Sequence, residues 1–264
     1  MFNLFSKNKE PKCPIDQDTR LWMENAFLWL ATQFGHDNIK NKITLIPTQE
    51  CFPVQYDGSI NSLHKTVGIV ANQMEIDPNE INVHTYKQSI QEFEGAFGYR
   101  LFTEIDKNSK EKLAAGVFFN KDENGKYDIL IEEKNLLAPE SLVGVLAHEF
   151  SHIKILGEKR LEQNDELLTD LCTVVFGLGI FNANSCFKEH KSFDSWGYNS
   201  IGYMKQQEWG YALALYAHFR YEEKPEWMKY LTPNVKSNFK KSQEYIFANI
   251  EKVFWEDYNG PTSN

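Results

Sequence analysis

The chain has 264 residues, of which 42% are hydrophobic and 14% aromatic, and its formal net charge is −9. This composition is typical of a folded globular protein and excludes extensive disorder. The acidic balance argues against nucleic acid as a partner. No run of about 18 apolar residues occurs, so no integral membrane segment is expected.

The first ten residues, MFNLFSKNKE, contain neither an apolar signal core nor a small-residue cleavage site. The four cysteines, Cys13, Cys51, Cys172 and Cys186, form no CxxC pair. Both features predict a cytoplasmic protein with free thiols.

Helices and strands alternate in the predicted N-terminal half. Helices are expected at 18–34, where Gly35 ends an apolar stripe, and at 60–75. Strands are expected at 43–47, 81–86, 114–120 and 127–132. The last two form a hairpin around Asn124-Gly125. A glycine-rich loop is expected at 91–100.

A further helix is predicted to begin at Pro139 and to end near Gly157. Its apolar residues recur at three- and four-residue spacing, which predicts one buried face: Leu142, Val143, Leu146, Phe150 and Ile153. This helix contains the sequence AHEFSHIK at 147–154, an HExxH motif.

The HExxH spacing places His148 and His152 one helical turn apart on the same face, where two imidazoles can hold one Zn²⁺. Glu149 projects beside them and is the candidate general base. Zinc can lower the pKa of a bound water to about 7, which makes hydroxide available at neutral pH.

Two carboxylates, Glu166 and Asp170, share one face of the next predicted helix. The other positions are apolar and are expected to be buried: Leu167, Leu168, Leu171, Val174, Val175 and Leu178. A carboxylate pair on such a helix is costly unless it is paired or binds metal. Glu166 is therefore the expected third zinc ligand, with Asp170 accepting a hydrogen bond from a ligand imidazole.

The order HExxH then ExxxD resembles the gluzincin metallopeptidases over residues 147–171. The resemblance implies that His148, His152 and Glu166 bind one zinc per chain, that Glu149 is the base and that Asp170 supports a histidine. Thirteen residues separate His152 from Glu166, fewer than in the better-known families, so Asp170 stays an alternative ligand. The whole chain also resembles bacterial proteins of this size, which implies no substrate.

The C-terminal part is predicted to be irregular at 182–205 and helical at 206–221, 225–231 and 233–254. Amide hydrolysis passes through an oxyanion, which a hydrogen-bond donor can stabilise. Tyr203, in a loop before a helix, and His218, on that helix, are the candidate catalytic donors.

These elements predict an α+β, zincin-like fold with a small N-terminal mixed or antiparallel sheet and a helical C-terminal lobe. Residues 1–264 are expected to form a single metallopeptidase-like domain. Its sheet-containing lobe spans approximately 15–135, and the helical lobe with the zinc site spans 136–264.

The predicted function is a zinc-dependent peptidase that hydrolyses a peptide or protein substrate. A zinc-binding sensor or regulatory module without turnover is the alternative, although the presence of Glu149 argues against it. A third possibility is an interaction protein in which the motif is incidental. Metal content separates the third class from the others, and Glu149→Gln separates the first two.

Overall fold

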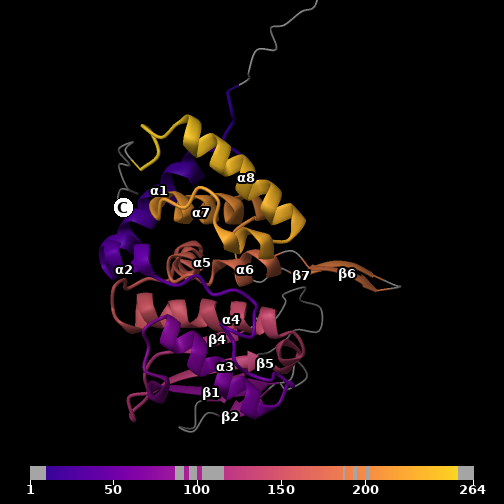
Figure 1. Ribbon diagram of the computed structural model, residues 1–264. Helices are drawn as coiled ribbons and strands as arrows, with labels where there is room; N and C mark the ends of the chain where they lie inside the picture. The colour runs from indigo at the N-terminus through magenta and orange to yellow at the C-terminus, as the bar shows by residue number, and fades with distance from the viewer. Residues whose placement is uncertain are drawn as a thin grey trace, which may run out of the picture. The chain divides into compact units, whose positions relative to one another are not determined.

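The computed structural model describes residues 10–86, 92–94, 100–102, 116–186, 188–192, 195–199 and 203–254 (Figure 1). Helices and short strands together confirm the α+β class. The chain divides into two compact units, Thr48–Asn164 and Met1–Pro47 with Asp165–Asn264. In the second of these units the first helices pack with the C-terminal ones.

A three-stranded mixed sheet lies in the unit Thr48–Asn164, with the strand order β1(Ile81–Tyr86), β5(Tyr127–Glu132), β4(Gly116–Phe119). Strand β1 is parallel to β5, and β4 is antiparallel to it. The predicted turn at Asn124-Gly125 precedes β5, and Gly125 adopts a φ of +76° that suits glycine. Ile129 and Ile131 are fully buried, so β5 anchors the sheet.

Two helices accompany this sheet, α3(Ile60–Gln73) and α4(Pro139–His152). Ser59 caps α3 by accepting a hydrogen bond from the Ser62 amide at 3.2 Å. Pro139 occupies the first turn of α4, where its missing N–H costs nothing. Helix α4 contacts both α3 and β4 (Figure 1). The HExxH helix is therefore packed against a helix and a strand of the sheet.

Shorter elements complete this unit. A 3-10 turn, η1(Pro78–Glu80), precedes β1, and η2(Glu133–Leu137) connects β5 to α4. Strands β2(Glu92–Glu94) and β3(Arg100–Phe102) form an antiparallel pair. The predicted loop at 91–100 is thus wrong at 92–94 and at Arg100, and residues 91 and 95–99 lie outside the described residues.

The other unit is mainly helical. Its elements are α1(Gln17–Phe34), α2(His36–Asn41), α5(Glu166–Val175), α6(Gly179–Ser185), β6(Lys188–Ser192), β7(Ser195–Asn199), α7(Gln206–Phe219), η4(Glu226–Tyr230) and α8(Pro233–Ala248). Helix α5 packs on α1, α6 and α7, and α7 packs on α8. Asp16 caps α1, and Gly35 ends it with a φ of +89°.

A buried polar network lies inside this helical unit. The Glu24 carboxylate is 1% exposed and accepts hydrogen bonds from Arg20, from the Tyr211 hydroxyl at 2.6 Å and from the Phe254 amide. Burial, followed by the charge of Glu24, raises the pKa of Tyr211. The network joins α1 to α7 and to the segment after α8.

Several predicted elements need correction. Residues 43–47 form no strand, and Leu45 instead donates its amide to the Gly177 carbonyl at 2.9 Å. The segment 182–205 is not irregular, because it contains the end of α6 and the β6–β7 pair. Helix α8 ends at Ala248 rather than at 254. Leu167 is 38% exposed, because it lies in the first turn of α5.

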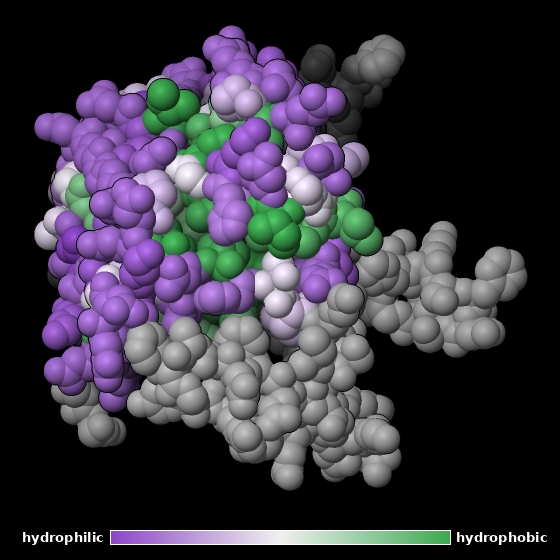
Figure 2. Space-filling view, turned by 90° about the horizontal axis from the view of Figure 1, so that it is seen from below, coloured by the Kyte–Doolittle hydropathy of each residue, from purple (hydrophilic) through white to green (hydrophobic). Residues whose placement is uncertain are grey.

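The surface in Figure 2 is hydrophilic over most of the described residues, with hydrophobic residues gathered toward the middle of the view. Within the described ranges, no helix combines the length and apolar character needed to cross a membrane.

Candidate metal centre

The HExxH motif occupies the last turns of α4. His148, Glu149 and His152 are 9%, 5% and 7% exposed, so all three side chains are almost completely buried. The two imidazoles meet edge to face, with ring centroids 4.9 Å apart and planes at 87°. A helical spacing of four residues therefore brings both histidines to one spot, as the sequence predicts.

Glu166 is the first residue of α5, and Asp165 caps this helix by accepting a hydrogen bond from the Leu168 amide at 3.1 Å. His148, His152 and Glu166 each offer a ligand atom, and the three atoms lie within 4.8 Å of one another. Two imidazoles and one carboxylate are a donor set of catalytic zinc sites. Two ligand atoms of one tetrahedral zinc are about 3.4 Å apart at ordinary zinc–ligand distances, so a separation of 4.8 Å would have to shorten by about an ångström when the three side chains bind a single ion.

Asp170 is fully buried on α5. Its Oδ2 atom accepts hydrogen bonds from the backbone amides of Tyr203 at 2.6 Å and Met204 at 2.9 Å. The carboxylate thus holds the segment that leads into α7. Its predicted bond to a ligand imidazole, and its alternative role as a ligand, stay predictions.

Strand β4 faces the motif with two side-chain positions. A Cβ built on Gly116 would lie 2.6 Å from Oε1 of Glu149. Two residues further, Phe118 stacks on the His152 imidazole with ring centroids 5.9 Å apart and planes at 18°. Residues two apart on a strand point to the same face, so one face of β4 borders both Glu149 and His152.

The charge of Glu149 also acts on Tyr86, at the end of β1. Burial, together with the charges of Glu132 and Glu149, raises the pKa of Tyr86 to about 12. The phenol therefore stays protonated at neutral pH and keeps its proton as a hydrogen-bond donor.

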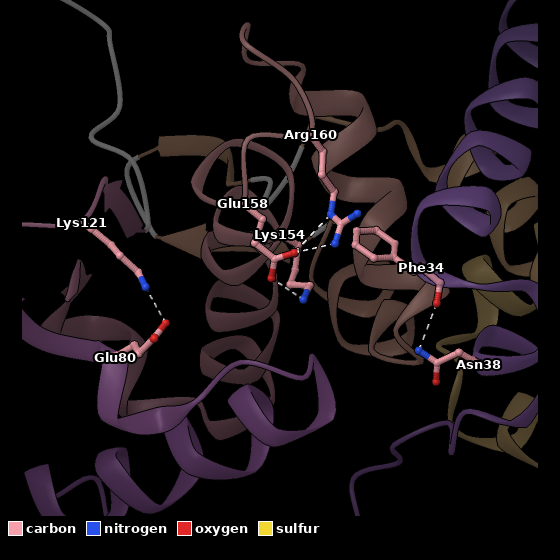
Figure 3. Close-up of polar contacts among 7 residues, drawn as sticks. All are labelled: Phe34, Asn38, Glu80, Lys121, Lys154, Glu158 and Arg160. Atoms are coloured by element: carbon pink, nitrogen blue, oxygen red, sulfur yellow. Dashed lines mark hydrogen bonds and ion pairs between the residues drawn. The ribbon is translucent and has the colours of Figure 1, made fainter. Parts of the chain in front are cut away.

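The end of the motif helix is held by packing and by charge. After His152 the chain forms a π-helical turn, η3(Ile153–Gly157). Gly157 approaches the Tyr127 ring so closely that an added Cβ would lie 2.8 Å from it. Figure 3 shows Glu158 between Lys154 and Arg160. Lys154 is only 5% exposed, whereas the side chains of Glu158 and Arg160 are about a quarter exposed.

Two other contacts in Figure 3 are separate from the motif. Lys121 pairs with Glu80 at 2.8 Å, and the Asn38 side chain donates to the Phe34 carbonyl at 3.2 Å. The first joins η1 to the residues after β4, and the second supports the turn between α1 and α2.

The predicted oxyanion donors occupy ordinary positions. Tyr203 is 63% exposed and is fixed through its backbone amide by Asp170. His218 is near the end of α7 and stacks on Phe254, with ring centroids 5.9 Å apart. Burial lowers the pKa of His218. These contacts supply packing and anchoring roles, so the catalytic roles of Tyr203 and His218 stay predictions.

Three residues of the site were not singled out from the sequence: Tyr86, Gly116 and Phe118. All lie in correctly predicted strands. Alternation along 114–120 places Gly116 and Phe118 on one face. The pattern does not say that this face meets the HExxH helix, because strand register is a tertiary property.

Comparisons of the chain with protein-family models, with curated proteins and with solved structures found no match. Any assignment of function therefore rests on the residues themselves.

Proposed function

We propose that this protein is a zinc-dependent peptidase in which His148, His152 and Glu166 hold one Zn²⁺ and Glu149 is the general base. The observation that supports it most is the convergence of three ligand atoms within 4.8 Å beside a nearly buried Glu149. Two different helices supply this set, so chance occurrence of the short motif explains it poorly.

The donor set favours catalysis over a structural role for the metal. Structural zinc sites usually have four protein ligands, whereas catalytic sites have three and an open position. Among the described residues, the group that can hold a metal contains three. Glu149 has no function in a purely structural site, whereas hydrolysis requires a base.

In this proposal the protein side chains position the metal and transfer protons. Zinc, when bound, lowers the pKa of water and polarises a carbonyl group. Glu149 accepts the proton of the attacking water and passes it to the leaving amine. Its low exposure keeps bulk water away from this carboxylate.

An extended peptide is the substrate that this arrangement favours. Strand β4 lies at one end of the strand order β1-β5-β4, so among the described strands it has a partner on one side only. A free strand edge can bind an extended chain through backbone hydrogen bonds. Because β4 also borders Glu149, a peptide paired there would lie close to the base.

The proposal is tested by comparing wild type with Glu149→Gln. Glutamine is nearly isosteric but cannot accept the proton, so the variant should keep its zinc and its fold. Peptide hydrolysis should fall at least about 10²-fold. Elemental analysis measures the zinc, and mass spectrometry of cell-lysate peptides, with a chelator control, measures cleavage.

The outcomes distinguish the three function classes. Absence of stoichiometric zinc after reconstitution would favour the interaction protein. Equal zinc in both forms without Glu149-dependent cleavage would favour the sensor. Equal cleavage by both forms would place the activity in a contaminant or at another site.

A further inference from the structure

The contact between strand β4 and Glu149 indicates how the base is kept in place. We propose that Gly116 is a positioning residue: its lack of a side chain lets the strand hold the Glu149 carboxylate in one position. The role of this contact in catalysis rests on the proposed peptidase function. The contact itself is independent of that function.

The packing at Gly116 leaves no room for a methyl group. An added Cβ would lie 2.6 Å from Oε1, 2.8 Å from Cγ and 2.9 Å from Cδ of Glu149. Carbon and oxygen atoms that are not bonded to each other do not approach so closely without displacement. Gly116 does not have a positive φ, so the glycine is needed for space and not for a left-handed backbone.

Neither backbone can easily retreat from this contact. Gly116 pairs with Ile131 and Phe118 with Ile129, and both isoleucines are fully buried. On the helix, Ala147 and Phe150, which flank His148 and Glu149, are fully buried as well. Close-packed interiors resist such shifts. The easiest response to a methyl group at 116 is therefore rotation of the Glu149 side chain.

The same strand face also supports a metal ligand. Phe118 stacks on His152, two residues along from the contact with Glu149. One rigid strand thus borders both the proton acceptor and a histidine. Catalysis is sensitive to such placement, since a misplacement of about 1 Å can cost about 10²-fold in rate.

The first test is a double-mutant cycle on thermal unfolding of the full-length protein in the presence of a chelator. Gly116→Ala should lower Tm by about 2–8 °C, the range expected for a methyl group forced into a packed site. In the Glu149→Ala background the overlapping atoms are absent, so the same substitution should lower Tm by less than half as much. Such coupling is the signature of a direct contact.

Gly68→Ala is the matched control. It makes the same chemical change in α3, where nothing lies within 4 Å of an added Cβ. Its effect on Tm should be small or favourable, because alanine is the better helix former. It should show no coupling to Glu149→Ala.

The second test uses any peptide that wild type cleaves and Glu149→Gln does not. Gly116→Ala should keep one zinc per chain while kcat falls at least about tenfold. KM should change less than kcat, because the substitution moves a proton acceptor. Gly68→Ala should keep both values.

Equal Tm changes in the two backgrounds would overturn the positioning role, as would full kcat in Gly116→Ala beside an inactive Glu149→Gln. If Gly116→Ala alone does not fold, recovery of folding in the Glu149→Ala background supports the role, and failure of both variants overturns it. If wild type cleaves nothing, the peptidase proposal fails, while the Tm cycle still decides whether Gly116 positions Glu149.

Discussion

The Asp170 carboxylate accepts a hydrogen bond of 2.6 Å from the backbone amide of Tyr203, which lies 33 residues further along the sequence. The same oxygen accepts a second hydrogen bond, of 2.9 Å, from the backbone amide of Met204. This relationship ties α5, which begins with Glu166, to the entrance of α7. A carboxylate that accepts hydrogen bonds from two backbone amides stabilises the fold whether or not metal is present.

The first prediction concerns Asp170→Ala. Removal of the carboxylate leaves two amides without their acceptor, so the free energy of unfolding should fall by about 2–4 kcal/mol. Asp170→Asn retains one acceptor oxygen and should cost less. Urea unfolding with a chelator present measures the change without any metal contribution. Glu162→Gln, at an exposed position, is the control. Equal stability of Asp170→Ala and wild type would show that the two hydrogen bonds are not important.

The second prediction concerns the buried network around Glu24. Glu24→Gln removes the negative charge that lies 3.1 Å from the Arg20 guanidinium, and Arg20 is only 4% exposed. The free energy of unfolding should fall by about 3 kcal/mol or more. Tyr211→Phe removes a single hydrogen bond to Glu24 and should cost about 1–2 kcal/mol. Asp18→Asn, exposed on the same helix, should stay within about 0.5 kcal/mol. A smaller effect of Glu24→Gln than of Tyr211→Phe would contradict this ranking.

The third prediction concerns pH. Burial lowers the pKa of His218 below its ordinary value of 6.5, so the unfolded chain binds more protons there than the folded chain. Stability therefore rises with pH through this window, and is lost as pH falls from 6.5 through the lowered pKa.

His218→Phe should remove that part of the pH dependence while keeping a ring against Phe254. The measurement is the difference in unfolding free energy between pH 5 and pH 8, compared between wild type and variant. His64→Phe, at an exposed position, provides the reference. An unchanged difference in His218→Phe would mean that His218 titrates normally.

The sequence predicted best those elements whose signal is local. The strands at 81–86 and 127–132 agree with the structure, because each has the composition of a strand and a turn signal beside it. The HExxH helix agrees as well, since its caps and apolar spacing lie within about twenty residues. The convergence of His148 and His152 follows from helical geometry alone.

Features that depend on tertiary contacts could not be predicted. Residues 188–192 read Lys-Glu-His-Lys-Ser and carry no apolar alternation, yet they pair as β6 with β7. The approach of Gly116 to Glu149 depends on which strand lies against the helix. The acceptor role of Asp170 toward Tyr203 depends on a contact between distant segments.

The last prediction concerns the ligand set. His148→Ala, His152→Ala and Glu166→Ala should each nearly abolish zinc binding, because each removes one of three donor atoms that lie within 4.8 Å. Asp170→Asn should weaken binding by only about 10–100-fold, as expected for a residue that supports ligands without binding metal. Elemental analysis at one equivalent of zinc and a competition titration with a chromogenic chelator measure both effects.

His64→Ala is the control in this series, since His64 is exposed on α3. It should retain wild-type affinity, whereas loss of binding there would indicate a nonspecific histidine effect. Comparison of the zinc affinities of Glu166→Ala and Asp170→Asn decides which carboxylate is the third ligand. Asp170 already accepts hydrogen bonds from two backbone amides through Oδ2. Glu166 instead has a carboxylate oxygen within 4.8 Å of a ring nitrogen of each of the two histidines. If Asp170→Asn abolished binding while Glu166→Ala spared it, the two carboxylates would have exchanged roles, and Asp170 would be the third ligand.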